Sequence, residues 1–421
     1  MKKSISIILS VLLIAFTMTA CGGDDKSPAK NNNTPSSPEA TTSAPEKEMV
    51  KNSDGLYEIA TAEDLVAFRD IVEEEMRKCY ENDPHAFIVS ESGAILVDDI
   101  DMSSVCGADK GNWRPIGMGV LDGEIYDKTG SFSGTFDGNG HSISGLYTDT
   151  TSTGGALFCG IRDANISNLT FKNCTLNCGY GADSDNPMIQ YGTGAVTMYM
   201  AGSEIKNCVV EDTVTITATY SVGGLVGLAD SDNGSNSIIE CVNRANVSAN
   251  DGLVGGIAGQ VTKKTRIHNC DNYGTISGTK SKIGGIVGYA SGSSSYAGTV
   301  LGCVNYGEIN NTADSSVCGI AGYNNSTVYF CINIGNINAN GGRAFDIADY
   351  ETGSTKWCIN TGEINGASNA DYSYSTLERD GFDLPPNAPE LKDGSLLESE
   401  KLGSFYWVQG ENLPEWSGEM P

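Results

Sequence analysis

Cys303-Val-Asn-Tyr-Gly-Glu-Ile309 is one copy of a phrase that occurs five times in the second half of this sequence. The copies share the frame Cys-x-Asn-x-Gly/Ala-x-Ile/Val and lie 29, 33, 28 and 27 residues apart. The other four copies are Cys241–Val247, Cys270–Ile276, Cys331–Ile337 and Cys358–Ile364. A period in this range indicates one supersecondary unit stacked on itself, so it predicts a repeat architecture whose function resides in a long surface.

A glycine-rich phrase runs in phase with the first. It reads Gly223-Gly-Leu-Val-Gly227, and its further copies are Gly255–Gly259, Gly284–Gly288 and Cys318–Gly322, the last with Cys in place of the first Gly. Apolar runs of four to six residues have strand length, and no stripe of helical period is present. We therefore expect an all-β chain in which each phrase lies beside its copy in the next turn, about 4.8 Å away.

Each position of the two phrases has an expected place in such a stack. Cys and Ile/Val should form inward columns, and Asn should sit at bends, where its side chain bonds backbone and a left-handed φ is tolerated. The glycines should supply a positive φ or a close approach of two backbones. This pattern predicts a parallel β-solenoid whose variable segments are loops.

The chain contains 13 Cys residues, and most of them follow the repeat. In-register side chains have parallel Cβ vectors, which is poor geometry for a disulfide, so we expect a buried column of thiols that pack as small hydrophobes. The column would contain Cys174, Cys208, Cys241, Cys270, Cys303, Cys331 and Cys358. Cys79 and Cys106 lie outside the repeats and are a possible disulfide pair.

The N-terminus carries a sorting signal. An apolar run, Ile5–Phe16, follows two lysines and precedes Thr17-Met-Thr-Ala-Cys21. The run is too short to span a bilayer and has the form of a secretory signal. Small residues before a Cys resemble a bacterial lipobox, which implies cleavage after residues 1–20, acylation of Cys21 with chains such as palmitate, and anchoring in the cell envelope at the cell surface.

The rest of the chain divides by composition. Residues 21–50 are rich in Lys, Asn, Pro, Ser and Thr and predict a disordered tether. Residues 51–112 predict a helix/strand cap, residues 113–368 the solenoid, and residues 369–421 a C-terminal cap or tail.

Within the predicted cap, Thr61 has the position of a helix N-cap, and apolar residues follow at helical spacing to about Lys78. Tyr57–Ile59 and Ala94–Met102 predict strands. The acidic run Glu73–Glu75 is interpreted as a solvated face of the helix.

Charge and composition limit the partners. The formal net charge is −27, from 26 Lys and Arg against 53 Asp and Glu, which disfavours nucleic acid and anionic membranes. The three His residues are not at metal-ligand spacing, and neither Cys-x-x-Cys nor a calcium-loop motif occurs. We expect no cofactor, no bound metal and a monomer.

Several segments resemble a known family. The two phrases together look like the GLUG-type repeat of bacterial surface proteins, which also occurs in N-terminal regions of some IgA-specific metallopeptidases. Ala62–Phe68, Trp113–Gly117 and Phe132–Leu146 are similar to the segments that precede such repeats. The resemblance covers about residues 55 to 365 and implies a right-handed parallel β-helix. The peptidase motif His-Glu-x-x-His is absent, so that activity is not implied.

Right-handed β-helices include polysaccharide lyases and hydrolases, which need converging carboxylates. The best candidate cluster consists of Asp99, Asp101, Asp137, His141 and Arg114. However, Asp-Gly and Asn-Gly within Asp137–His141 are also common turn dipeptides, which favours a structural role.

We therefore expect a non-catalytic surface lipoprotein that presents its solenoid for adhesion or for binding a host or bacterial glycan or protein. The alternatives are a lyase or hydrolase of the β-helix type and a passive envelope spacer. Tyr180–Tyr191 and Ser291–Tyr296 are insertions relative to the shortest repeat and could supply aromatic contacts to sugars.

Overall fold

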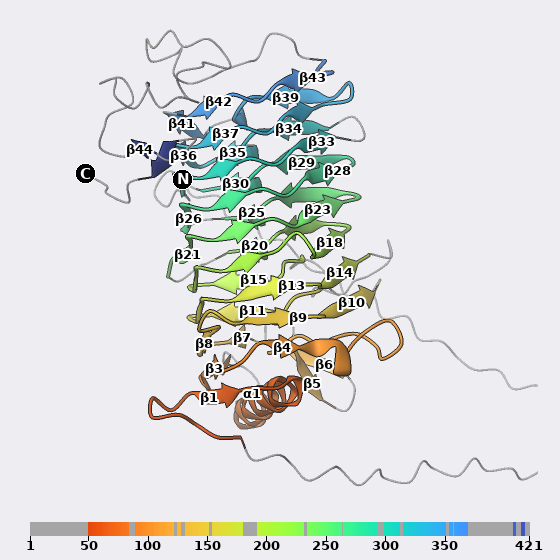
Figure 1. Cartoon of the computed structure of the whole chain (residues 1–421), viewed down its shortest axis with the longest axis vertical. Coiled ribbons are helices and arrows are strands. Elements are labelled where there is room, and N and C mark those ends of the chain that lie inside the picture. Colours follow the sequence, from red (N-terminus) through yellow and green to blue (C-terminus); the bar gives the residue numbers. More distant parts are fainter. Residues whose placement is uncertain are drawn as a thin grey trace, which may run out of the picture. The chain divides into compact units, whose positions relative to one another are not determined.

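The part of the chain from residue 57 to 365 is a parallel β-solenoid (Figure 1). The computed structural model describes residues 49–83, 89–121, 124–127, 131–150, 154–179, 192–230, 234–262, 264–292, 299–311, 315–350, 353–356, 358–368, 407–409 and 414–416. The predicted all-β fold class is confirmed, whereas the right hand of the coil stays a prediction. In these ranges no helix is long and apolar enough to cross a bilayer.

Five parallel sheets run along the stack, and a full turn of chain visits them in the order 2, 1, 3, 4, 5. Sheet 1 consists of β1 (Tyr57–Ile59), β3 (Ala94–Leu96), β8 (Thr135–Asp137), β12 (Asn165–Ser167), β16 (Glu204–Lys206), β21 (Asn236–Ile239), β26 (Thr265–His268), β31 (Thr299–Leu301), β36 (Thr327–Tyr329) and β41 (Ser354–Lys356). Sheet 2 consists of β2 (Val89–Ser90), β7 (Ser131–Phe132), β11 (Phe158–Arg162), β15 (Thr197–Ala201), β20 (Val226–Ala229), β25 (Ala258–Val261), β30 (Val287–Ser291), β35 (Ala321–Asn325) and β40 (Ala348–Tyr350).

Sheet 3 consists of β4 (Ile100–Asp101), β9 (Ser142–Ser144), β13 (Thr170–Lys172), β17 (Val209–Val210), β22 (Val242–Asn243), β27 (Asp271–Asn272), β32 (Val304–Asn305), β37 (Ile332–Asn333) and β42 (Ile359–Asn360). Sheet 4 consists of β10 (Tyr147–Thr150), β14 (Thr175–Cys178), β18 (Thr215–Ala218), β23 (Asn246–Ala249), β28 (Ile276–Gly278), β33 (Ile309–Asn311), β38 (Ile337–Asn338) and β43 (Ile364–Asn365). Sheet 5 consists of β19 (Ser221–Gly223), β24 (Gly252–Gly255), β29 (Ser281–Gly284), β34 (Ser316–Cys318) and β39 (Arg343–Phe345).

The remaining described elements are a helix, a short 3-10 helix and two antiparallel strand pairs. They are α1 (Ala62–Asn82), η1 (Met102–Ser104), β5 (Gly119–Leu121) with β6 (Glu124–Asp127), and β44 (Trp407–Gln409) with β45 (Pro414–Trp416). The strands β1 to β4 of the predicted cap pair in register with solenoid strands or with each other, so the sheets already begin inside residues 51–112.

Helix α1 packs against the first turn of the solenoid. The Thr61 side chain accepts a hydrogen bond from the backbone N–H of Asp64, which confirms the predicted N-cap. Leu65, Phe68 and Val72 are fully buried on the face toward the sheets.

The interpretation of the acidic run as a solvated face is wrong for two of its three members. The Glu73 carboxylate lies 2.6 Å from the Arg114 guanidinium. Glu75 accepts hydrogen bonds from the hydroxyls of Ser90 and Ser92. These acids tie the helix to the turn beneath it, which explains why polar residues occur on both of its faces.

The thiol column is confirmed for six of the seven predicted cysteines, which the strand register stacks at the corner between sheets 1 and 3: Cys208, Cys241, Cys270, Cys303, Cys331 and Cys358. The prediction is wrong for Cys174, which lies at the next corner, between sheets 3 and 4, in register with Leu146 and Val214.

All seven are free and buried, and each Sγ except that of Cys358 donates to the carbonyl two residues earlier, as from Cys270 to His268 O at 3.2 Å. Burial raises the pKa of the Cys270 and Cys331 thiols, and that of Cys174 to about 12. These thiols are therefore protonated core side chains with little nucleophilic character.

Beside the thiols, the Asn of each Cys phrase forms a second buried column. Asn272 Nδ2 donates to Asn305 Oδ1 at 2.7 Å, and Asn305 Nδ2 donates to Asn333 Oδ1 at 2.7 Å. The same Asn305 Nδ2 also donates to Gly307 O at 2.8 Å. The ladder continues to Asn243 at one end and Asn360 at the other. Since every rung has a partner, these polar side chains can be fully buried.

The two phrases are in phase because they touch across the interior. A Cβ built on Gly285 would lie 2.4 Å from Asn305 Cγ and 2.3 Å from Gly319 O. Gly224, Gly256 and Gly319 meet the Asn of their own turn in the same way. Close approach of backbone and side chain therefore requires these glycines.

The Asn of the Cys phrase was expected to adopt a left-handed φ, and this expectation is wrong. The left-handed residue is instead the one directly before the Cys, at the corner between sheets 1 and 3, as in Asn207, Glu240, Asn269 and Phe330, with φ between 51° and 55°. Asn tolerates this region readily, whereas Phe330 adopts it at a cost in strain.

Candidate functional site

The candidate catalytic residues predicted from the sequence do not form a single site. Asp99 and His141 do come together, because Asp99 Oδ1 lies 3.6 Å from His141 Nδ1. The same oxygen accepts a hydrogen bond from the backbone N–H of Ser142 at 2.7 Å, and this bond lowers the pKa of Asp99. An acidic, largely exposed carboxylate of this kind is a poor general acid.

Asp101 and Asp137 support turns. Asp101 Oδ1 accepts from the backbone N–H of Ser103 and caps η1, and this hydrogen bond lowers its pKa. Asp137 Oδ1 accepts from the backbone N–H of Asn139 at 2.8 Å and from Asn168 Nδ2 at 2.9 Å. Both arrangements agree with the interpretation of these residues as parts of turns.

Arg114 lies against helix α1, where its guanidinium contacts Glu73 and Asp70. Burial outweighs the attraction of Arg114 and raises the pKa of Glu73 to about 7. Among the described residues, the Arg114 guanidinium thus pairs with acids of helix α1 and not with Asp99, Asp101 or Asp137. Throughout the described ranges, no group of three or more His, Cys, Asp or Glu is placed to hold a metal ion.

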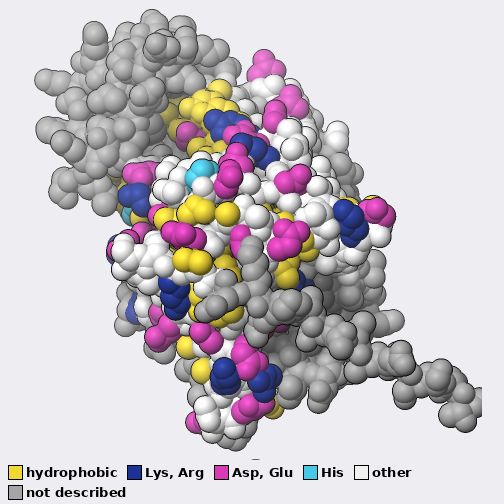
Figure 2. All heavy atoms as spheres, turned by 60° about the horizontal axis from the view of Figure 1, so that its bottom comes forward, with side chains coloured by type: hydrophobic (Ala, Val, Ile, Leu, Met, Phe, Trp, Pro, Cys, Tyr) yellow, Lys and Arg dark blue, Asp and Glu magenta, His cyan; other side chains and the backbone are white. Residues whose placement is uncertain are grey.

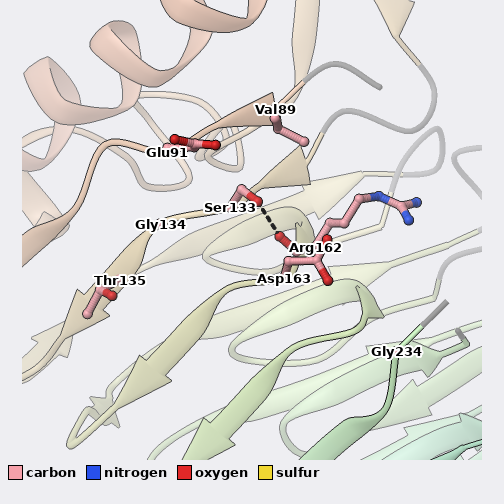
Figure 3. Close-up of a pocket in the computed structure, with 8 residues that line it drawn as sticks. All are labelled: Val89, Glu91, Ser133, Gly134, Thr135, Arg162, Asp163 and Gly234. Carbon is pink, nitrogen blue, oxygen red and sulfur yellow. Dashed lines mark hydrogen bonds between the residues drawn. The ribbon is translucent and has the colours of Figure 1, made fainter. Parts of the chain in front are cut away.

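A cleft that sequence reasoning missed lies at the corner between sheets 2 and 1 (Figure 3). Its volume is about 700 Å³. The lining residues come from four turns and are Val89, Glu91, Ser133, Gly134, Thr135, Arg162, Asp163 and Gly234. No motif connects these positions, and only a register of the turns could have grouped them.

The cleft offers two carboxylates, one guanidinium and two hydroxyls. Asp163 has a left-handed φ of 52°, which turns the chain from sheet 2 into sheet 1. The Ser133 hydroxyl donates to Arg162 O at 2.5 Å and joins two neighbouring turns. Figure 3 shows Glu91 and Asp163 on opposite sides of Ser133, with the Arg162 side chain extending away from both. Such a lining suits a polar ligand with several hydroxyl or amide groups.

Aromatic side chains on the outside form ladders. The rings of Tyr273 and Tyr306 stack at 4.4 Å with an angle of 2°, and those of Tyr289 and Tyr323 at 4.7 Å with an angle of 4°. The Arg244 guanidinium lies 5.3 Å from the centre of the Tyr273 ring. The ring faces that would stack on a sugar are thus used within the protein.

Several predictions concern residues outside the described ranges. They include the signal, the Cys21 lipidation site and most of the tether, Tyr180 to Tyr191, and most of Ser291–Tyr296. Cys79 and Cys106 are both described, and both are free thiols: Cys79 Sγ donates to Val89 O, and Cys106 Sγ donates to Gly145 O.

The surface of the solenoid is polar and of mixed sign. Figure 2 shows acidic side chains distributed over the displayed face, with Lys and Arg between them. On this face the acids and bases are interspersed, so it does not form a single charged binding field.

Among solved structures, the chain is similar to a Bacteroides ovatus protein provisionally named an immunoglobulin A1 protease. The TM-score is 0.53 at 16% sequence identity, and the match covers 88% of this chain and 94% of that one. At this identity the likeness shows the β-solenoid fold alone. No protein-family model matches the sequence, and no curated protein matches it significantly.

Proposed function

We propose that this chain is a cell-surface lipoprotein that presents its β-solenoid for adhesion, by binding a glycan or a protein without catalysing a reaction. The observation that carries the proposal is the contrast between inward and outward positions in each turn. Inward positions repeat as Cys, Asn and Ile/Val, whereas outward positions change from turn to turn. A surface that varies on a constant scaffold is suited to recognition.

The cleft at the corner of sheets 2 and 1 is the best candidate for the contact. The carboxylates of Glu91 and Asp163 can accept hydrogen bonds from sugar hydroxyls or peptide N–H groups, and Arg162 can donate to acceptors. The non-catalytic part of the proposal is supported by the dispersal of Asp99, Asp101, Asp137 and Arg114 into turns and helix contacts.

Binding of the full-length chain, purified in detergent, to a glycan array and to host-matrix proteins tests the adhesion proposal. A ligand found there should lose most of its affinity for the double variant Glu91→Gln/Asp163→Asn. The exposed turn residue Asp212 offers a matched control, since Asp212→Asn removes one carboxylate away from the cleft. Unsaturated product from a polyuronate panel would instead show a lyase, and absence of any ligand would favour a spacer.

Anchoring is tested separately. The proposal predicts that the wild-type chain incorporates labelled fatty acid and sediments with membranes. Cys21→Ser should lose both properties, whereas Cys79→Ser should keep them. Membrane association of Cys21→Ser equal to that of the wild type would contradict the lipoprotein assignment.

A further inference from the structure

At the corner between sheets 1 and 3, the polarity of the outward side chains differs from turn to turn. In the early turns, the outward residues at the end of sheet 1 are Asp137, Ser167 and Lys206. Before these residues the same column contains Glu58 and Ile95, and in later turns it continues as Ile239, His268, Leu301, Tyr329 and Lys356. Most of its apolar members lie between Ile239 and Tyr329, which indicates that this part of the corner faces something other than water.

The neighbouring outward column on sheet 3 follows the same trend. It begins with Ser142 and Thr170 and continues as Val209, Val242, Asp271, Val304, Ile332 and Ile359. Together with side chains on adjacent positions, its later members form a hydrophobic cluster separate from the interior core. This cluster, the corner patch, consists of Val304, Tyr306, Phe330, Ile332 and Ile334.

Ser142 at the start of this column is buried, the members from Thr170 to Asp271 are half-buried, and the members from Val304 onward are buried again. Val242 and Asp271 are half-buried, whereas Val304 and Ile332 are each 5% exposed and Ile359 is 7% exposed. Outward side chains on an open sheet keep more of their surface in water, because their neighbours in the column cover only two of their sides. Val304 and Ile332 pack against Tyr306, Phe330 and Ile334, which are themselves only partly buried and leave an apolar face that a further segment could cover.

Polar atoms at the same corner also lack partners. His268 Nε2 and Asn269 Oδ1 are buried, and no described residue forms a hydrogen bond with either atom. Burying a polar atom without a partner is unfavourable, so a covering segment that supplies hydrogen bonds here would be stabilised.

We infer that residues 369–421 of this chain dock on the corner patch and cover the outside of sheet 3 in the last turns. Val304 and Ile332 lie in the late turns, close to the end of the stack where this segment leaves the solenoid after Ser368. It contains the apolar stretches Phe405–Val408 and Leu413–Trp416, whose strands β44 and β45 pair antiparallel. An extended chain spans about 3.3 Å per residue, so these stretches reach any face of the stack.

This docking goes beyond a cap on the open end, which was the expectation from sequence. It assigns the corner patch to the chain itself, so the patch is not the adhesive surface of the proposed function. It also protects an aliphatic and aromatic face that would otherwise promote association between copies.

Hydroxyl-radical footprinting of the full chain and of the chain ending at residue 368 tests the inference. Labelling of Tyr306 and Phe330 should rise several-fold when the segment is removed. Tyr289 and Tyr323, which stack on sheet 2, serve as an internal control and should not change. Unchanged labelling of Tyr306 and Phe330 would overturn the inference, and so would protection that depends on protein concentration, since a second copy would then be the cover.

A substitution in the full chain keeps the test decisive if the shorter chain does not fold. Ile332→Lys places a charge in the patch and should raise labelling of Tyr306, Trp407 and Trp416 while the far-UV circular dichroism stays unchanged. Thr170→Lys alters the same column in an early turn and should leave all three unchanged. Equal labelling of the tryptophans in Ile332→Lys and the wild type would contradict docking.

Discussion

The early and late turns of this solenoid fill the same kind of interior in different ways. The early turns use large rings: Phe132 stacks on Phe158 at 4.9 Å, and Phe136 meets Phe158 edge-on at 5.4 Å. Phe68 of helix α1 joins the group at 6.0 Å from Phe132. The late turns use columns of Cys, Asn and Ile/Val, in which each side chain contacts copies of itself.

This difference shows two ways to specify a stack. In the aromatic end, each ring makes contacts that are not repeated in other turns. Such packing is suited to the junction where helix α1 lies on the sheets. The ladder region instead sets the register through hydrogen bonds that recur in each turn, so a change there affects the turns on both sides. Substitutions made in one region at a time separate these two kinds of packing.

The largest effect is expected in the aromatic end. Phe158→Ala removes a fully buried ring that contacts two others, and it should lower the free energy of unfolding by about 3–5 kcal/mol. Phe158→Leu retains much of the volume and should cost clearly less. Equal losses for the two variants in denaturant titrations would show that the rings do not pack as described.

A smaller effect is expected for one rung of the Asn ladder. Asn305→Ala leaves Asn272 Nδ2 without its acceptor and Asn333 Oδ1 without its donor, at a cost of about 2–3 kcal/mol. Asn310 offers a control, because it accepts from Asn338 on the outer face of sheet 4, where water can replace the bond. If Asn310→Ala destabilises as much as Asn305→Ala in thermal melts, burial of the ladder is not what makes it stabilising.

The stability of the late turns should depend on pH through Asp271. Burial raises the pKa of its carboxyl from about 4 to about 7, so the folded state binds this proton more tightly than the unfolded state. Its contribution is therefore fully present below pH 4 and is lost as the pH rises to 7. Asp271→Val, which matches Val242 and Val304 in the column, should gain on the order of 1–2 kcal/mol over the wild type at pH 8 and little at pH 4. A gain independent of pH would contradict this assignment.

The smallest effect is expected for a single thiol. Cys303→Ala removes one sulfur from the column and leaves a small cavity, at a cost of about 1 kcal/mol. Cys79→Ala changes a half-buried thiol outside the column and should cost less still. A loss of several kcal/mol for Cys303→Ala in denaturant titrations would indicate a covalent or metal-bound role for the column.

Sequence reasoning succeeded where a local pattern carries the structure. The repeat spacing predicted the stacked strands, and the parallel Cβ vectors predicted free thiols in Cys241 and its copies. Helix α1 followed from its N-cap and apolar spacing. These features depend on residues that are close in sequence or on a period that is visible in it.

Other features depend on contacts that no local pattern shows. The left-handed corner accepts residues as different as Glu240 and Phe330, because its conformation is imposed by the turn between two sheets. The ion pair of Glu73 with Arg114 and the cleft at Glu91 and Asp163 join distant segments. They become visible only after the register of the turns is known.

The buried thiol column is tested most directly by alkylating the cysteines without reductant. The experiment uses the full-length chain, purified without oxygen, in its native and its unfolded state. Mass spectrometry should find the six column cysteines unmodified in the native protein and all of them modified after unfolding, while half-buried Cys79 reacts in both states. Column thiols that react in the native protein, or that remain unmodified after unfolding because they are paired in disulfides, would contradict the account.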